Sequence, residues 1–392
     1  MEVIAFRGSV RFLICTVCSW SMYSVAFGSE YTIRDVGALG IYATYAGGIN
    51  ASGQVVGLST RPFRTNATGM IDASSDLGGG PDDWAHRIND AGQVVGEAVF
   101  TPGMNGHAFR TESNGGINSA TDLGTLGGNI SFGYDINASG QVVGSAQVLG
   151  LGSANHAFRT TANGKIDSAS DLGSLIGASG NSYAYGINSS GQVVGISDSG
   201  VFGVPRAFRT TANGVISAAS DLGSLGGNFT LAYDINDSGR TVGYSRIAGN
   251  FADHAFRTAP NGMIDLASDL GTLGGNASYG VSINSSGQTV GSSFLAGNQG
   301  QHAFVTDLNG KMVDLNTLIP ADSGWTLIGA GDINNFGQIT AFGTHNGVEG
   351  SVVLTPVAAP LVPEPGCLGL VAMLALPLFR KSIPQVGRSK RR

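Results

Sequence analysis

The stretch YDINASGQVVGS, Tyr134–Ser145, holds residues whose spacing could form a metal site. Asp135, Asn137 and Gly140 follow the opening of a calcium-binding loop, but the acid such a loop needs at its twelfth position is replaced here by Ala146. Asn and Gly at this spacing also suit a tight turn, in which Asn accepts hydrogen bonds from the backbone ahead of it. We therefore expect a turn between two strands, with no bound metal and no other cofactor.

A second group of reactive side chains lies in the segment GGGPDDWAHRIND, which contains Asp82, Asp83 and Trp84, with Glu97 directly after the next predicted strand. Two carboxylates beside an aromatic ring could serve a glycosidase or a lyase. Trp84, however, stands five residues before Asn89, where other parts of the chain carry Tyr or Phe, which favours a core aromatic. No Ser–His–Asp order, phosphate loop or nucleotide fingerprint appears. We expect a non-catalytic protein, with a polysaccharide-degrading enzyme as the alternative.

Four histidines occupy one place in a repeated HAF tripeptide, and each is followed by an Asp-Leu-Gly or Asp-Leu-Asn segment. As metal ligands they would have to converge, yet Arg61 and Arg206 take the same place elsewhere. We expect these side chains to make structural hydrogen bonds. The histidines are His107, His156, His254 and His302.

The Asn–Gly turn residues and the HAF tripeptides belong to an internal repeat with a period of about 48 residues. Its first signature is an Ile-Asn pair followed three places later by Gly. The Asn residues are Asn50, Asn89, Asn137, Asn188, Asn236, Asn284 and Asn334. Each unit is expected to form four short strands: one ending in the Ile-Asn pair, then QVVG, then HAFRT, then the segment ending in DLG.

Repeated four-stranded units of this length are typical of a β-propeller. Six units are complete and the seventh lacks its fourth strand, whereas Tyr31–Leu39 is a fourth strand without a unit. Pairing this N-terminal segment with the last unit would remove a free sheet edge. The predicted fold is all-β: a seven-bladed β-propeller of four-stranded blades, closed by the N-terminal strand, over residues 29–357.

Composition and charge narrow the class of protein. Charged residues make up 12% of the chain and Gly contributes 62 residues, which favours strands and turns over helices. Residues 29–361 hold 13 Lys and Arg against 25 Asp and Glu, a net charge of −12, so we expect no nucleic-acid partner. The three cysteines, Cys15, Cys18 and Cys367, lie in the terminal segments.

The N-terminal segment has the features of a secretory signal peptide. Arg7 and Arg11 precede an apolar run over residues 12–27, and small residues flank a cleavage position between Gly28 and Ser29. We expect residues 1–28 to be removed by signal peptidase.

The C-terminal segment has three parts: a linker over residues 358–365 with Val362, Pro363, Glu364 and Pro365, a hydrophobic sorting helix over 366–380, and a basic tail over 381–392. This order resembles the PEP-CTERM sorting signal of bacterial envelope proteins, although the basic tail is longer than is usual. The resemblance implies processing by an exosortase-like enzyme, with transient membrane contact through residues 366–379.

The signatures IN-x-x-GQVVG, HAFRT and DLGTLGG resemble those of the bacterial extracellular HAF-repeat family over residues 35–355. That resemblance implies a protein exported to the cell envelope, outer surface or extracellular matrix, and brings no catalytic residues.

We expect the protein to bind a matrix polysaccharide or another envelope protein, or else to be a purely structural matrix component. The connections between the second and third strands vary most among the units, which favours binding on their face. The expected binding residues are Phe100, Phe202 and Phe251, together with Asp82, Asp83 and Trp84.

Overall fold

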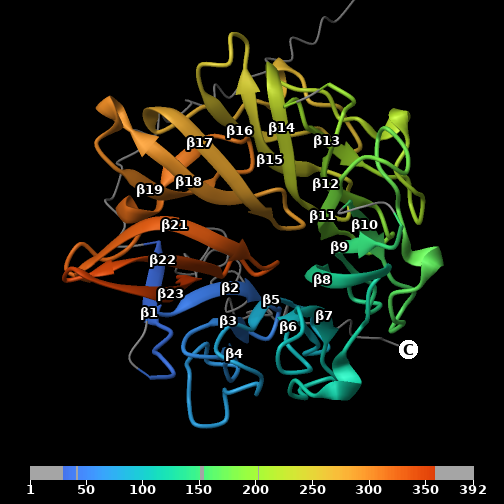
Figure 1. The fold of residues 1–392 in the computed structure, drawn as a ribbon. Coiled ribbons are helices and arrows are strands. Elements are labelled where there is room, and N and C mark those ends of the chain that lie inside the picture. The colour runs from blue at the N-terminus through green and yellow to red at the C-terminus, as the bar shows by residue number, and fades with distance from the viewer. Residues whose placement is uncertain (1–29, 41–42, 151–153, 202, 358–392) are drawn as a thin grey trace, which may run out of the picture. The chain divides into compact units, whose positions relative to one another are not determined.

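The structure, a computed structural model, describes residues 30–40, 43–150, 154–201 and 203–357 (Figure 1). The expected signal peptide with Gly28 and Ser29, the segment with Val362–Pro365, the apolar run and the basic tail lie outside the described residues.

The described chain is all-β and consists of seven small antiparallel sheets. The first strands of the sheets are β2 (Tyr45–Ile49), β5 (Trp84–Ile88), β8 (Gly127–Ile136), β11 (Ser182–Ile187), β14 (Gly226–Ile235), β17 (Gly274–Ile283) and β21 (Trp325–Ile333). The second strands are β3 (Val55–Leu58), β6 (Val94–Ala98), β9 (Val142–Val148), β12 (Val193–Ser197), β15 (Thr241–Ile247), β18 (Thr289–Leu295) and β22 (Ile339–His345). The third strands are β4 (Pro62–Arg64), β7 (His107–Arg110), β10 (Asn155–Arg159), β13 (Arg206–Arg209), β16 (Asp253–Arg257), β19 (Gln301–Thr306) and β23 (Val348–Pro356).

The expectation of four strands in every sheet is wrong for five of the seven sheets. Only the sheet containing β20 (Met312–Asp314) and the sheet containing β1 (Tyr31–Asp35) have a fourth strand. In the other five, the segment ending in DLG makes a single antiparallel bridge, such as Phe158 to Asp171. Local capping explains four of these, because the Asn, Asp or Ser before each short turn bonds to the turn's own backbone or side chains. The turns are η1 (Ser119–Thr121), η2 (Ser168–Ser170), η3 (Ala218–Ser220) and η4 (Leu266–Ser268), and two further ones are η5 (Ala296–Asn298) and η6 (Leu315–Thr317).

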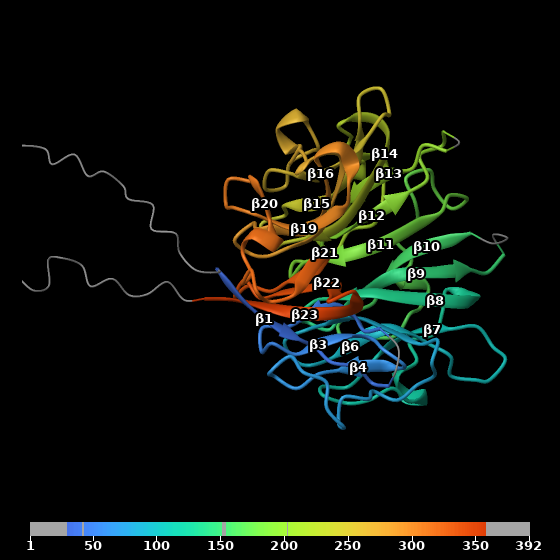
Figure 2. The ribbon, with the colours of Figure 1, turned by 90° about the vertical axis from the view of Figure 1, so that its left-hand side faces the viewer.

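The predicted pairing of the N-terminal segment with the last sheet is confirmed. β1 runs antiparallel to β23, from Tyr31 opposite Pro356 to Asp35 opposite Val352 (Figure 2). The ring of Pro356 lies beside Gly337, in the turn between β21 and β22. The two ends of the described chain therefore meet on the side of the molecule that carries the turns between first and second strands.

The seven first strands lie around a common centre (Figure 1). Each contacts the first strands of two other sheets, and β21 contacts β2. A repeated hydrogen bond follows the same order: the side-chain amide of each repeat Asn donates to the backbone carbonyl of the next, and Asn334 donates to the carbonyl of Asn50 at 2.9 Å. The amide oxygen of Asn137 accepts from the backbone N–H groups of Ser139 and Gln141, which confirms the turn expected there.

The core is built from the same positions in each unit. The Phe of the HAF tripeptide is fully buried in six sheets. The Gly of QVVG lets the first and second strands approach closely: at Gly144, a Cβ would lie 1.8 Å from the carbonyl oxygen of Phe132. The buried phenylalanines are Phe63, Phe109, Phe158, Phe208, Phe256 and Phe304.

Candidate functional site

A β-bulge interrupts every first strand at the same place. In β8, Gly133 pairs with Gly144 and Asp135 pairs with Val143, so Tyr134 between them has no partner of its own. The same shift occurs in β2, β5, β11, β14, β17 and β21. A bulge re-aims side chains, so two consecutive residues of one strand can face the same region.

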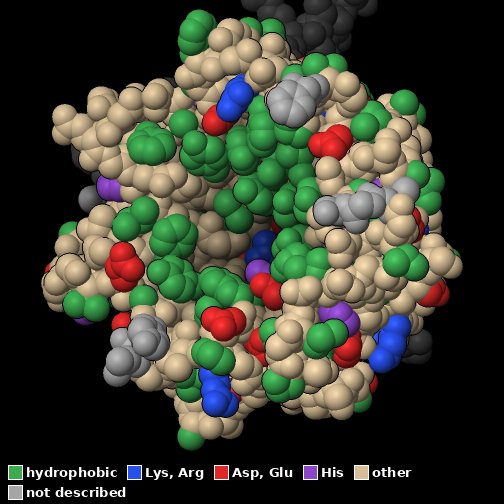
Figure 3. All heavy atoms as spheres, in the orientation of Figure 1, with side chains coloured by type: hydrophobic (Ala, Val, Ile, Leu, Met, Phe, Trp, Pro, Cys, Tyr) green, Lys and Arg blue, Asp and Glu red, His purple; other side chains and the backbone are tan. Residues whose placement is uncertain are grey.

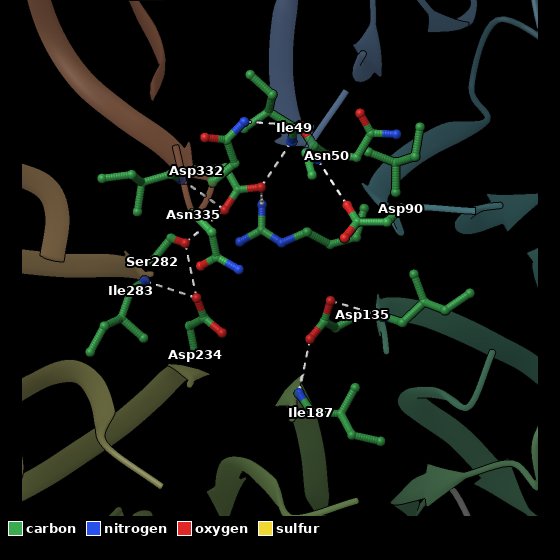
Figure 4. A pocket seen from close by; sticks show the side chains of 16 residues that line it. Ile49, Asn50, Asp90, Asp135, Ile187, Asp234, Ser282, Ile283, Asp332 and Asn335 are labelled. Carbon is green, nitrogen blue, oxygen red and sulfur yellow. Dashed lines mark hydrogen bonds and ion pairs between the residues drawn. The ribbon is translucent and has the colours of Figure 1, made fainter. Parts of the chain in front are cut away.

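Two adjoining pockets at the centre are lined by these residues. The first, which we call the central mouth, has a volume of about 280 Å³ and is lined by the bulged residue of every unit. The second, the central floor, has a volume of about 190 Å³ and takes the residue that follows the bulge in five units (Figure 4). Arg87 lines both pockets. The mouth residues are Gly47, His86, Tyr134, Tyr185, Tyr233, Val281 and Gly331; the floor residues after the bulge are Arg87, Asp135, Asp234, Ser282 and Asp332.

Polar groups of the central floor connect neighbouring sheets. Asp135 accepts a hydrogen bond from the backbone of Ile187 in the next first strand, at 2.8 Å. Asp234 accepts in the same way from Ile283, and Asp332 accepts from Ile49. The hydroxyl oxygen of Ser282 lies within hydrogen-bond distance of both Asp234 and Asp332, at 2.9 and 2.7 Å. These carboxylates therefore have a structural role between the sheets.

Arg87 is the basic group among these acids. Its Nη1 donates to the carbonyl oxygen of Gly47 at 3.0 Å and lies 3.7 Å from Oδ2 of Asp332. Burial by itself lowers the pKa of Arg87, but Asp332, Asp135 and Asp234 outweigh burial and raise it. Burial and the charge of Asp234 together raise the pKa of Asp135 to about 7, against the opposing effect of Arg87. Burial also raises the pKa of Asp234, against the effect of Arg87.

Aromatic rings line about half of the central mouth. The rings of Tyr134 and Tyr185 have centroids 5.2 Å apart, and those of Tyr185 and Tyr233 are 5.6 Å apart. His86 extends this row, 5.6 Å from Tyr134, and Trp84 stacks on His86 at 6.1 Å. We call these five residues the aromatic arc. Figure 3 shows hydrophobic side chains gathered around the central hollow, with basic and histidine side chains within it.

A carboxylate lies beside the arc. Oε2 of Glu97, on β6, is 2.6 Å from Nε2 of His86. Trp84 is opposite Glu97 in the sheet register, at the end of β5 that is remote from its turn to β6. The arc therefore lies toward the face that carries the connections between second and third strands, which is the face on which the sequence predicts binding.

The structure separates the residues of the predicted acidic group. Asp83 is 1% exposed and accepts hydrogen bonds from the backbone of Gly80 and Val99, so its prediction as a binding residue is wrong. Asp82 is exposed. Trp84 is 37% exposed, so its interpretation as a core aromatic is wrong, while its prediction as a binding residue is compatible with its place in the arc.

The predicted loop residues differ in exposure. Phe100 is partly buried and packs against the hydrophobic cluster that contains Ala98 and Phe109, so its prediction as an exposed ligand contact is wrong. Phe251 is 87% exposed in the connection between β15 and β16. Phe202 lies outside the described residues.

The histidines of the HAF tripeptide make the expected structural hydrogen bonds. Nδ1 of His156 lies 2.8 Å from Oδ1 of Asp171, and the three other histidines pair in the same way with the Asp of their own unit. In the two units with Arg at this place, Arg61 and Arg206 face the equivalent aspartates.

The sequence signal that could have revealed the arc is the third residue before each repeat Asn. It is Tyr in three consecutive units and His in the unit before them. A strict two-residue alternation assigns this residue and the next to opposite faces. The bulge removes that alternation, so Tyr134 and Asp135 line adjoining pockets.

Comparisons with known proteins provide no family and no function. No family model matches the chain, and no curated protein matches it. Among solved structures, a hypothetical protein from Leishmania major is similar over 57% of this chain and 82% of its own, with 12% sequence identity and a TM-score of 0.23. Within the described ranges, no helix has the length and apolar character needed to cross a membrane.

Proposed function

We propose that this protein is an exported, non-catalytic seven-bladed β-propeller that binds carbohydrate at the central mouth. The observation that carries the proposal is the row of tyrosine rings from three consecutive first strands around a pocket of about 280 Å³. Pockets of roughly 300 Å³ and above are typical of small-ligand sites. The mouth therefore suits a single sugar ring or the end of a glycan chain.

Three features support the propeller assignment, and all of them follow the order of the seven sheets along the chain. These are the seven antiparallel sheets, the contacts between successive first strands, and the side-chain hydrogen bonds that lead from Asn50 through each unit and from Asn334 back to Asn50. Pairing of β1 with β23 supports closure by the N-terminal strand.

Carbohydrate is favoured as the ligand by the chemistry of the arc. The faces of sugar rings present C–H groups that pack on aromatic faces, while their hydroxyls need hydrogen-bond partners. Tyrosine supplies both a broad apolar face and a hydroxyl. Glycine at two mouth positions, Gly47 and Gly331, leaves the opposite wall open to a ring lying on the arc.

A glycan array probed with residues 29–357 tests this function. We expect Tyr185→Ala to weaken binding about tenfold or more, because an aromatic platform contributes roughly 0.5–1.5 kcal/mol beyond its buried area. Trp84→Ala, a change at a more exposed position, should weaken binding with no loss of melting temperature. Phe251→Ala is the matched control, since its ring is exposed and lies outside the arc. Equal glycan binding by all four proteins would show that the arc is not the site.

We further propose that the PEP-CTERM-like segment sorts the protein through an exosortase-like enzyme to the cell surface or extracellular matrix. Replacing Pro363, Glu364 and Pro365 by alanine is expected to leave an unprocessed form in the membrane fraction. Mass spectrometry of the mature C-terminus measures this directly. Intact Arg392 in extracellular wild-type protein would contradict the proposal.

The last strand, β23, ends at Pro356, beside the turn at Gly337. Attachment through the C-terminal segment would therefore leave the aromatic arc on the opposite side of the domain.

The alternative of a polysaccharide-degrading enzyme keeps one candidate, since Glu97 lies beside the arc and is hydrogen-bonded to His86. Release of reducing ends from a polysaccharide panel, abolished by Glu97→Gln, would favour that alternative. A purely structural matrix component predicts instead that the array detects no ligand.

A further inference from the structure

Negative charge dominates the region beneath the aromatic arc. The carboxylates of Asp135, Asp234 and Asp332 line the central floor, and that of Asp90 lines its edge. Arg87 is the basic residue lining this pocket, and it also lines the central mouth. Acidic side chains therefore outnumber basic ones in this pocket.

The raised pKa of Arg87 reflects the acidic side chains around it. Its side chain is only 20% exposed, and burial alone would lower its pKa, yet the three floor aspartates raise it. The guanidinium is thus stabilised as a cation by its surroundings, and its charge is already compensated by Asp332.

Acidic side chains also lie near the two ends of the aromatic arc. Glu97 lies beside His86 at the end of the arc. At the other end, the guanidinium of Arg246 lies 5.5 Å from the ring centre of Phe229, and it is 3.5 Å from a carboxylate oxygen of Asp253. That cation is therefore paired, whereas the ring faces of the arc are regions of negative electrostatic potential that attract cations.

We propose that the central mouth selects a carbohydrate that carries protonated amino groups over neutral and uronate-containing carbohydrates. This inference rests on the proposed function and names the ligand class of the same site. The ammonium group would lie over the tyrosine faces, near the acidic floor, while the sugar ring packs on the arc. A uronate would instead bring a carboxylate toward like charges, which is unfavourable.

Three oligosaccharides of equal length test the inference with wild-type residues 29–357: an oligomer of glucosamine, its N-acetylated counterpart and an oligomer of galacturonic acid. Calorimetry at a pH where the amines are protonated should give about tenfold tighter binding to the glucosamine oligomer than to the other two. That preference should shrink at about 1 M salt, where the Debye length is only about 3 Å.

Three variants distinguish the contribution of charge to glycan binding from that of packing on the aromatic rings. Glu97→Gln should reduce the preference for the glucosamine oligomer over the N-acetylated oligomer about threefold or more. Asp82→Asn is the matched control, because Asp82 is exposed and does not line the mouth or the floor. Tyr185→Ala should weaken binding of both oligomers, because the sugar rings of both pack on the arc.

Each contrary outcome has a separate meaning. If the N-acetylated or galacturonic acid oligomer binds as tightly as the glucosamine oligomer, the inference is wrong and the proposed function stands. If none of the three binds but the array detects another glycan that requires Tyr185, the inference is again wrong. If no glycan on the array binds, the proposed function fails, and the inference fails with it.

Discussion

A chain that begins after Leu39 is expected to lose its cooperative unfolding transition or to assemble into oligomers. Its missing segment includes β1, which pairs with β23 through five residues, and Val36, which is fully buried. Burial of each such apolar side chain contributes roughly 1.5–3 kcal/mol, against a total of about 5–15 kcal/mol for a typical domain. Truncation also exposes the edge of β23 to pairing with other molecules.

Thermal unfolding and sedimentation of the truncated chain measure this effect. Adding a peptide of residues 29–40 to the truncated chain serves as the control, because it should restore the monomer and raise the melting temperature. A truncated chain that is monomeric and melts like the parent would contradict the role assigned to β1.

The free energy of unfolding is expected to fall as the pH rises from about 4 to about 7, and Asp135→Asn should flatten much of this dependence. Burial raises the pKa of Asp135 from 3.8 to about 7 in the folded protein. The folded state therefore binds a proton more tightly than the unfolded state across that window. The associated stability is complete below the unfolded-state pKa and is lost as the pH rises through the folded-state value.

Urea unfolding at pH values on both sides of that window measures how steeply the free energy of unfolding depends on pH. One pKa unit corresponds to about 1.4 kcal/mol, so this is a large effect for one side chain. A hydrogen bond to Asp269 raises the pKa of His254, which adds stability lost with rising pH, but this contribution is common to wild type and variant. Asp82→Asn, at an exposed position, should keep the wild-type slope. The same slope in Asp135→Asn and wild type would contradict the burial of a titrating carboxyl at the centre.

Local patterns were sufficient to predict much of the fold. The repeat spacing predicted the turn at Asn137, a structural hydrogen bond at His156, and the match between the unpaired N-terminal strand and the last sheet, because each depends on residues close in sequence or on a missing partner. The all-β class followed from the Gly-rich, weakly charged composition for the same reason.

The candidate site could not be predicted in the same way. A bulge adds one residue that the sequence does not reveal, and without it the two-residue alternation of a strand would place Tyr134 and Asp135 on opposite faces. Arg87 and Asp332 are more than 240 positions apart in sequence, and only the order of the sheets brings their charges within 3.7 Å. Short polar turns also competed with a regular fourth strand, as at Ser168–Ser170, where Asp167 caps the turn.

Tyrosine footprinting tests the binding site most directly. Residues 29–357 would be nitrated with and without the glycan that the array selects, and modification at each tyrosine would be measured by mass spectrometry. The account predicts protection of Tyr134, Tyr185 and Tyr233, with Tyr45, which is 47% exposed and does not line the mouth, modified equally in both samples. Bound glycan that leaves these three tyrosines as reactive as in the free protein would contradict binding at the central mouth.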